Sequence, residues 1–260
     1  GSNYGITALL KIGGLADKEI TVGRLAFWLT PKINAAGRLG HASRAVKLLT
    51  TQNPVLALEL AQDLEKENNR RKDITLRITE EAIYMVEKEC DLDNEKAILL
   101  KKQNWHSGVI GIVASRIKET FSRPAIIISM GINEGKGSCR SIPNFDIVDA
   151  LKECSEYLIG FGGHPIAAGL SISPNKYEMF REVFLQIAND RIQTENLQPT
   201  INIDAELELG DLNNRMIKFL HSLEPYGPGN KRPVFVSRNL LVEGIPKIIG
   251  IAKDEIRSIE

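Results

Sequence analysis

A glycine-rich segment with one histidine contains the residues whose types and spacing point most clearly to chemistry. It reads Gly-Gly-His-Pro-Ile-Ala-Ala-Gly over residues 162–169. Glycine lets a ligand approach the backbone closely, and an imidazole can donate a hydrogen bond to an anion or stack on a base. We therefore expect a loop that touches a phosphate or a nucleotide through Gly162, Gly163 and His164. The alternative is a tight turn that leads into a buried strand.

A second candidate is the serine–arginine pair within Gly-Ser-Cys-Arg-Ser, residues 137–141. Side chains alternate along a strand, so Ser138 and Arg140 should share one face, where a hydroxyl and a guanidinium can clamp a phosphate. Ser141 belongs to the same candidate set. The segment is not a P-loop, because no serine or threonine directly follows Lys136. No Gly-x-Ser-x-Gly elbow marks Ser141 as a nucleophile.

A third candidate lies in a stretch between Ile20 and Leu58 that has basic residues and no acidic residue. There, the small residues after Asn34 would let the backbone approach a ligand. Asn34 can donate and accept hydrogen bonds, and Arg38 offers a planar fork for a phosphate. The alternatives are an ordinary surface with uneven charge and a helix-start turn that carries a surface arginine.

A fourth candidate is Asn-Trp-His-Ser-Gly, residues 104–108, which precedes an apolar helix. The helix N-terminus offers unpaired N–H groups to an anion, and Trp105 offers a stacking face for a base. His106 is a candidate phosphate ligand. The alternative reading makes Trp105 part of the core and His106 a hydrogen-bonding residue at the helix end.

The composition limits the possible partners and compartments. The 33 basic and 33 acidic residues cancel, so net charge does not indicate nucleic acid. The three cysteines form no close pair and no metal-type spacing, which suits a reducing cytoplasm. No apolar run approaches the roughly 20 residues that span a bilayer, so we expect no membrane association. Gly1-Ser2 resembles an expression scar, and we expect the chain to be a fragment of a longer protein.

No metal site is evident in the sequence. The histidines are scattered, and Asp91 and Asp93 lie in a turn without neighbouring ligands. A hard cation needs several convergent oxygens, so we expect no resident metal in this chain.

The hydrophobic pattern predicts an α/β protein. Short helices are expected over residues 3–50, and Asn53-Pro54 should begin a helix of about 35 residues, roughly 50 Å long. Its polar centre predicts a rod whose ends pack on two different bodies, with a break near Asn68-Asn69 as the alternative. Residues 91–195 should form one α/β domain. Beyond a linker, strands are expected over 201–209, 234–236 and 240–249 and a helix over 212–223.

Five segments resemble the RecJ family of single-strand-specific exonucleases, within the DHH phosphoesterase superfamily. They are PKINAAGRLG, NWHSGVIGIVASRI, GSCRS, FGGHPIAAG and LEPYGPGNKRPVF, in the family's order and approximate spacing. The resemblance covers nearly the whole chain. It implies that residues 1–50 are the tail of a DHH domain, 51–90 a connector helix, 91–195 a DHHA1 domain and 196–260 a partial OB-fold domain.

The resemblance also implies a function. The parent protein would hydrolyse single-stranded DNA from the 5′ end with Mn²⁺ or Mg²⁺, in DNA repair and recombination. The family's metal ligands lie upstream of these residues, so we expect no catalytic residue here and no cleavage by the fragment alone. Arg38, Ser138, Arg140 and the Gly-Gly-His segment would grip phosphates and bases. The implied partners are single-stranded DNA, a single-strand-binding protein and a helicase, for a monomer in the cytoplasm.

Two other functions stay open at this point. One is a non-catalytic module that binds single strands. The other is a DHH/DHHA1 phosphodiesterase for short oligonucleotides or cyclic dinucleotides, although those enzymes usually end with the DHHA1 domain.

Overall fold

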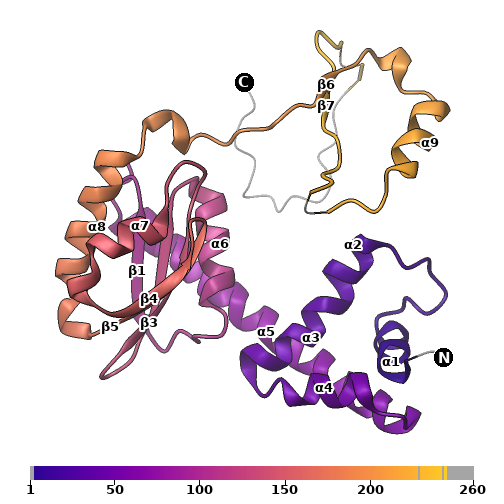
Figure 1. Ribbon diagram of the computed structural model, residues 1–260, viewed down its shortest axis with the longest axis horizontal. Helices are drawn as coiled ribbons and strands as arrows, with labels where there is room; N and C mark the ends of the chain where they lie inside the picture. Colours follow the sequence, from indigo (N-terminus) through magenta and orange to yellow (C-terminus); the bar gives the residue numbers. More distant parts are fainter. Residues whose placement is uncertain (1–2, 228, 242, 245–260) are drawn as a thin grey trace. The chain divides into compact units, whose positions relative to one another are not determined.

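The computed structural model of the chain describes residues 3–227, 229–241 and 243–244. The chain divides into two units, residues 1–199 and residues 200–260. Figure 1 labels most of their helices and strands. The four domains expected from the sequence are a finer division than this one, and their boundaries stay a prediction.

Short helices form the beginning of the first unit. They are α1 (Tyr4–Ile12), α2 (Val22–Arg24), a π-helical turn (Leu25–Leu29), α3 (Thr30–Leu39) and α4 (Ser43–Thr50). Asn3 caps α1, because its side chain accepts a hydrogen bond from the Ile6 backbone N–H at 3.0 Å. The segment from Asn34 to Arg38 is neither a loop nor a helix start. It forms the second half of α3, because Ala35 and Ala36 are fully buried on the side that packs against α5.

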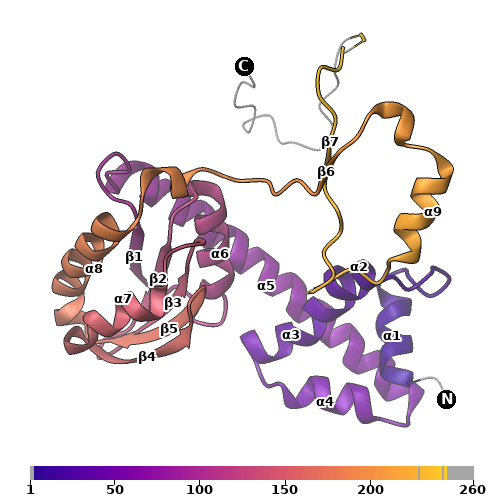
Figure 2. The same cartoon turned by 45° about the horizontal axis from the view of Figure 1, so that its top comes forward.

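The long helix α5 (Pro54–Glu89) is continuous over 36 residues. Asn53 caps it by accepting hydrogen bonds from two backbone N–H groups, and Pro54 occupies the first helical position. Its first half packs against α1, α3 and α4, and its second half packs against α6 and β1. Figure 2 shows the helix joining both regions of this unit. The predicted rod is confirmed, and the alternative break is wrong because Asn68 is buried and accepts a hydrogen bond from Arg71.

A five-stranded mixed sheet in the order β1-β2-β3-β5-β4 forms the centre of the α/β region. Its strands are β1 (Ile98–Gln103), β2 (Ala125–Met130), β3 (Gly135–Arg140), β4 (Leu158–His164) and β5 (Ala167–Ile172). β1 and β2 are parallel and are joined by a crossover helix, and the remaining pairs are antiparallel. Short apolar or β-branched runs in the sequence predict strands over 97–100, 125–129, 137–141 and 168–173, which match β1, β2, β3 and β5 to within a few residues, whereas β4 is not predicted.

Helices cover the two faces of the sheet with different cores. On one face α6 (Ile110–Phe121) and the second half of α5 bury Ile98, Leu100 and Ile127. On the other face α7 (Ile147–Glu153) and α8 (Tyr177–Arg191) bury Ile126, Ile128 and Cys139. Short 3₁₀ turns flank these helices at Ser155–Tyr157, Pro174–Lys176 and Thr194–Leu197.

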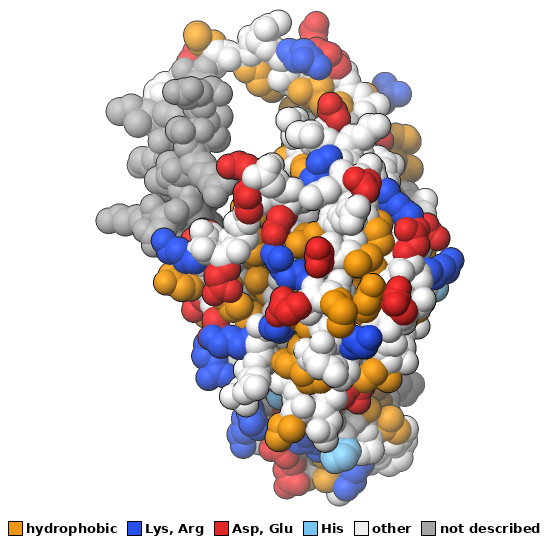
Figure 3. Space-filling model, turned by 90° about the vertical axis from the view of Figure 1, so that its left-hand side faces the viewer, with side chains coloured by type: hydrophobic (Ala, Val, Ile, Leu, Met, Phe, Trp, Pro, Cys, Tyr) orange, Lys and Arg blue, Asp and Glu red, His pale blue; other side chains and the backbone are white. Residues whose placement is uncertain are grey.

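The outer side of α8 is a mixed surface. Figure 3 looks at the side of the molecule where α8 lies in Figure 1 and shows acidic, basic and apolar side chains interspersed. Glu178, Glu182 and Asp190 are exposed on this helix. Charges of both signs are therefore mixed on this side, and they form no continuous basic patch in this view.

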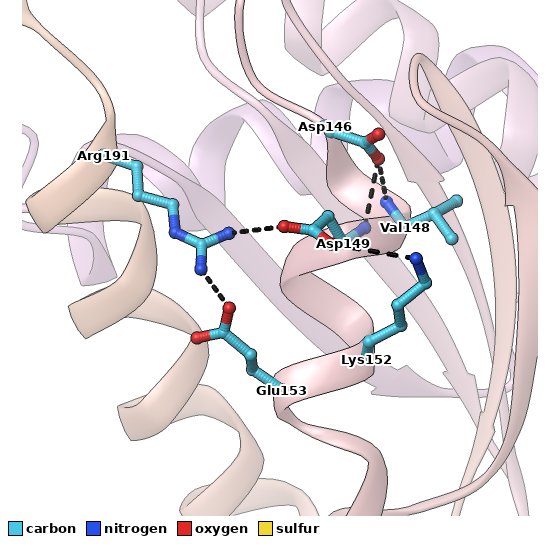
Figure 4. Close-up of polar contacts among 6 residues, drawn as sticks. All are labelled: Asp146, Val148, Asp149, Lys152, Glu153 and Arg191. Atoms are coloured by element: carbon cyan, nitrogen blue, oxygen red, sulfur yellow. Dashed lines mark hydrogen bonds and ion pairs between the residues drawn. The ribbon is translucent and has the colours of Figure 1, made fainter.

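Ion pairs join α7 and α8 above their shared core (Figure 4). Arg191 at the end of α8 donates to the carboxylate of Asp149 at 3.1 Å and to that of Glu153. Asp146 caps α7 by accepting hydrogen bonds from the Val148 and Asp149 N–H groups. These ion pairs are solvent-exposed and therefore add little to the stability of the fold.

The Gly-Gly-His segment is not the loop that the sequence suggests. Gly162, Gly163 and His164 are the last residues of edge strand β4 and pair with Gly169, Ala168 and Ala167 of β5. A short turn at residues 165–166 joins the two strands, and the Pro165 and Ile166 carbonyls accept hydrogen bonds from Ile147 and Ser141. The antiparallel partner satisfies the backbone of this segment, which explains why residues of weak strand propensity form a strand.

The second unit contains few regular elements in its described part. They are β6 (Ala205–Glu206), a 3₁₀ turn (Leu209–Asp211), α9 (Asn214–Ser222) and β7 (Phe235–Val236), with β6 and β7 parallel. The predicted helix is confirmed. The expected strand over 201–209 is wrong for all but two residues, because its partner β7 has only two residues to pair with. The strand expected over 240–249 falls mostly outside the described residues.

Candidate nucleic-acid interface

Three rows of residues cross one face of the sheet, from β3 through β5 to β4. Arg140, Ala167 and His164 form one row. Ser138, Gly169 and Gly162 form the next, and Lys136, Ser171 and Gly160 form the third. Cross-strand partners project to the same face, and this is the α6 face, since Cys139 between Ser138 and Arg140 lies in the opposite core. Two strand spacings of roughly 4.8 Å each separate Arg140 from His164.

Glycines leave the centre of this face open. Gly162 and Gly169 are exposed, although they sit within paired strands. A Cβ added at Gly162 would meet no atom within 4 Å, and one at Gly169 would only touch the Gly137 carbonyl oxygen at 3.7 Å. Packing therefore does not require glycine at either position. A depression of about 360 Å³ continues this surface past Gly160, Lys136 and Ser171.

Arg140 and Ser138 lie side by side, as the sequence predicts. Nη1 of Arg140 donates to Oγ of Ser138 at 3.2 Å and to the Cys139 carbonyl at 2.8 Å. Its Nε donates to Oγ of Ser115 on α6 at 3.1 Å. A Cβ at Gly111 would come within 3.0 Å of the Ser138 hydroxyl and 3.2 Å of Nη2 of Arg140. Glycine at position 111 therefore leaves room beside both groups.

Arg38 reaches the beginning of the same helix from α3. Its Nη1 donates to the Gly108 carbonyl oxygen at 3.2 Å. A Cβ at Gly108 would lie 2.0 Å from the Arg38 carbonyl oxygen, so only glycine permits this approach. Gly108 lies two residues before α6 begins and Gly111 lies in its first turn, so Arg38 contacts the N-terminal end of the helix that packs on Ser138 and Arg140. Asn34 is exposed one helical turn before Arg38.

Two candidates from the sequence are buried and cannot touch a ligand in this structure. Trp105 is 4% exposed, and its Nε1 donates to Oε2 of Glu81 at 2.5 Å, so the expectation of a stacking face is wrong. The ring instead belongs to the core between α5 and the sheet. Ser141 is 2% exposed and donates its hydroxyl hydrogen to the Phe145 carbonyl at 2.6 Å. Both residues satisfy their polar groups internally, which explains their burial.

His106 has the role described by the alternative reading. Its Nδ1 accepts a hydrogen bond from the Gly108 backbone N–H at 3.1 Å, just before α6 begins at Ile110. The residue is exposed near the Arg38–Gly108 contact. The ring therefore shapes the turn, and its other nitrogen faces away from that bond.

Sequence reasoning missed several residues of this surface. Ser115 and Gly111 lie in an apolar helix, and only a paired strand brings them against Arg140. Burial lowers the pKa of Arg71 on α5, and the positive charges of Arg38 and of Arg116 on α6 lower it further. Glycines at positions 108 and 111 could have indicated from the sequence that other segments pack closely against the beginning of α6.

The described residues do not fit a metal site. No three histidine, cysteine, aspartate or glutamate side chains gather so that they could hold an ion, within residues 3–227, 229–241 and 243–244. The described helices also include none long and apolar enough to cross a membrane.

Two domain families match the chain. The DHHA1 domain matches residues 94–190, and the RecJ OB domain matches residues 203–257. The single-stranded-DNA-specific exonuclease RecJ of Bacillus subtilis is 35% identical over 249 residues, which cover 95% of this chain and 31% of that protein. The enzyme of the same name from Haemophilus influenzae is 36% identical over 239 residues, with 89% and 41% covered.

Solved structures agree with these matches. The crystal structure of RecJ in complex with Mg²⁺ from Thermus thermophilus has a TM-score of 0.80 and 31% identity, covering 90% of this chain and 36% of that one. The structure of an exonuclease RecJ bound to manganese has a TM-score of 0.65 and 32% identity, covering 74% and 46%. The chain spans less than half of the length of each of these relatives. It is therefore a homologue of the RecJ exonucleases, in which a helical N-terminal region precedes a DHHA1 α/β domain with a mixed sheet and a RecJ OB domain.

Proposed function

We propose that this chain is the strand-gripping portion of an exonuclease that hydrolyses single-stranded DNA in the 5′→3′ direction, in DNA repair and recombination. The observation that supports it best is the Ser138–Arg140 pair beside a face opened by Gly162 and Gly169. The hydroxyl and the guanidinium would hold a phosphate from two directions. The bare glycine face would let the sugar and base lie close to the backbone.

His164 and Arg38 would add contacts to the strand on either side of the Ser138–Arg140 pair. His164 lies at the sheet edge in the row of Arg140, and Arg38 lies beside α6 next to Gly108. Asn34 would add a hydrogen bond one turn away. A single strand suits this surface better than a duplex, because the bases must lie unpaired against the glycine face.

The reaction itself would need groups that the described residues do not provide. Relatives of this chain were solved with Mg²⁺ and with Mn²⁺. Such ions generate a nucleophile from water and stabilise the leaving oxygen. In this proposal the chain binds and orients the strand, and the metal ligands belong to another part of the protein. A single-strand-binding protein and a helicase would supply the single strand.

Fluorescence anisotropy tests the proposal. A 5′-phosphorylated single strand, a matched duplex and a dinucleotide are titrated with the chain at low and moderate salt. We expect salt-sensitive binding that prefers the single strand. Equal affinity for the dinucleotide and the long strand would instead support a phosphodiesterase of short oligonucleotides. Rapid cleavage of the strand by this chain with Mn²⁺ would contradict our separation of binding from metal chemistry.

A further inference from the structure

A row of polar residues crosses the whole sheet on the α6 face, one row away from Ser138. From β1 to β4 it consists of Lys102, Ser129, Lys136, Ser171 and Gly160. Cross-strand partners project to the same face of a sheet, and their Cβ atoms lie about 5 Å apart. Residues two apart on a strand are about 7 Å apart, so Lys136 lies that far from Ser138 along β3. The row is therefore the nearest neighbour of the Ser138–Arg140 pair on this side.

The two halves of this row differ in how their polar groups are used. On β1, Lys102 pairs with the Glu81 carboxylate, and on β2 the Ser129 hydroxyl donates to the Trp105 carbonyl at 2.5 Å. The ion pairs and side-chain hydrogen bonds of the described residues include neither the ammonium of Lys136 nor the hydroxyl of Ser171. Lys136 is exposed and Ser171 is half-buried, so both groups are accessible to a ligand.

Lys136 and Ser171 border a hollow in the sheet surface. Together with Gly160 and Gly169 they line the depression of about 360 Å³. Helix α6 packs on β2 and β3, and both glycines, on β4 and β5, are exposed. A Cβ added at Gly160 would meet no atom within 4 Å, and its φ is not in the left-handed region. Neither packing nor backbone conformation therefore requires glycine at this position, and the bare surface leaves room for a ligand.

The chemistry of these groups indicates which ligand fits. An ammonium and a neighbouring hydroxyl can both donate to the oxygens of one phosphate. The ammonium of Lys136 sits on a flexible four-carbon stem, so it can reach a phosphate without a fixed geometry. The glycines beside it expose backbone on which a sugar or base can lie. A nucleotide unit has both parts, and a strand of them can contact this row and the Ser138–Arg140 pair together.

We propose that Lys136 and Ser171 hold a second phosphate of the single strand, next to the one at the Ser138–Arg140 pair, with the adjoining nucleotide over Gly160 and Gly169. This inference rests on the proposed strand binding. It gives the strand a path along β3, from Arg140 past Ser138 to Lys136.

The salt dependence of single-strand binding tests the inference. Lys136→Gln is the main variant, because the residue is exposed and the melting temperature should not depend on its charge. We expect the log–log slope of affinity against salt to fall in magnitude by about 0.7, the value for one phosphate on a single strand. The matched control is Lys152→Gln, which removes an exposed lysine of α7 on the opposite face of the sheet and should leave the slope unchanged.

Ser171→Ala tests the other half of the site. Loss of the hydroxyl should weaken strand binding about threefold without changing the slope, because no charge is removed. The effect should shrink in the Lys136→Gln background, since both side chains hold the same phosphate. Ser173→Ala, a half-buried serine just beyond β5, is the control. Equal affinities of the two serine variants would remove Ser171 from the site.

Ligand length separates a second site from a general effect of charge. A dinucleotide has one internal phosphate, which should occupy the Ser138–Arg140 pair, so Lys136→Gln should bind it as the wild type does. An equal loss of affinity for the dinucleotide and the long strand would overturn the second site.

The failures of the two proposals differ. Wild-type strand binding with an unchanged slope in Lys136→Gln overturns this inference and leaves the proposed function standing. Absence of strand binding by the wild-type chain overturns the proposed function, and this inference with it.

Discussion

Arg140 on β3 donates a hydrogen bond from Nε to Oγ of Ser115 on α6, at 3.1 Å. Ser115 in turn donates to the Gly111 carbonyl oxygen in the preceding turn of its helix, at 3.1 Å. The guanidinium is therefore oriented from one side by the helix and from the other by Ser138. A group fixed before the ligand arrives loses less conformational entropy on binding.

Replacing Ser115 with alanine should weaken single-strand binding about fivefold to tenfold, or about 1 to 1.4 kcal/mol. Arg140 would keep its charge but lose the acceptor that orients Nε. The melting temperature should change little, because the hydroxyl is only half-buried. Thr120→Ala removes an exposed hydroxyl from the same helix and serves as the control. Equal affinities of the two variants would show that Ser115 does not position Arg140.

Valine at Gly169 should abolish most of the binding while leaving the fold intact. The added Cβ would meet only the Gly137 carbonyl at 3.7 Å, and valine favours strands. Its methyl groups would cover the face where we propose the sugar and base to lie. Anisotropy and thermal melting measured on one sample separate the two effects. Unchanged affinity in a well-folded variant would remove the glycine face from the interface.

Alanine at Gly163 should act on stability and not first on binding. This residue has a φ of 151°, and an added Cβ would lie 2.4 Å from the Ala167 carbonyl oxygen. Strain of this kind costs about 1 to 3 kcal/mol, and the close contact adds to it. The midpoint of chemical unfolding should fall clearly for Gly163→Ala and stay near the wild-type value for Gly162→Ala, which meets no atom within 4 Å.

His164→Ala should lower single-strand affinity with little effect on the melting temperature. The side chain is exposed at the end of β4 and its loss creates no cavity. A large fall in melting temperature would show that the residue supports the hairpin rather than a ligand.

The stability of the α/β region should fall in acid partly through Glu81. Hydrogen bonds from Lys102 and then Trp105 hold the pKa of this carboxyl below its ordinary value of 4.5. A carboxyl with a lowered folded pKa stabilises the protein above its ordinary pKa, and this contribution is lost as the pH falls below 4.5. Unfolding free energies of Glu81→Gln should therefore depend less on pH in that range than those of the wild type.

Glu87→Gln is the control for that pH series, since Glu87 is exposed on the same helix. If Glu81→Gln and the wild type lose stability in parallel below pH 4.5, the contacts to Lys102 and Trp105 do not contribute as described.

Local patterns were enough to predict much of the fold. Asn53-Pro54 marks the start of α5 because capping and the proline position act within one turn. Alternation along β3 places Ser138 and Arg140 on one face for a similarly local reason. Local patterns could not predict that Gly162 and Gly163 lie in a strand, because this conformation results from pairing with β5 and not from the strand propensity of glycine.

The parts of the site that sequence reasoning missed depend on contacts between distant segments. Ser115 meets Arg140 only after α6 packs on β3. Trp105 lies in the core between α5 and the sheet, where Glu81 of α5 accepts its N–H. An exposed tryptophan and a buried one look the same in a sequence.

The salt dependence of single-strand binding by Arg140→Ala tests the central claim most directly. We expect weaker binding and a log–log slope smaller in magnitude by about 0.7, because one phosphate contact is lost. Lys152→Ala removes an exposed positive charge from α7, on the opposite face of the sheet, and should leave the slope unchanged. Wild-type affinity and slope in Arg140→Ala would contradict the assignment of the Ser138–Arg140 pair as the phosphate clamp.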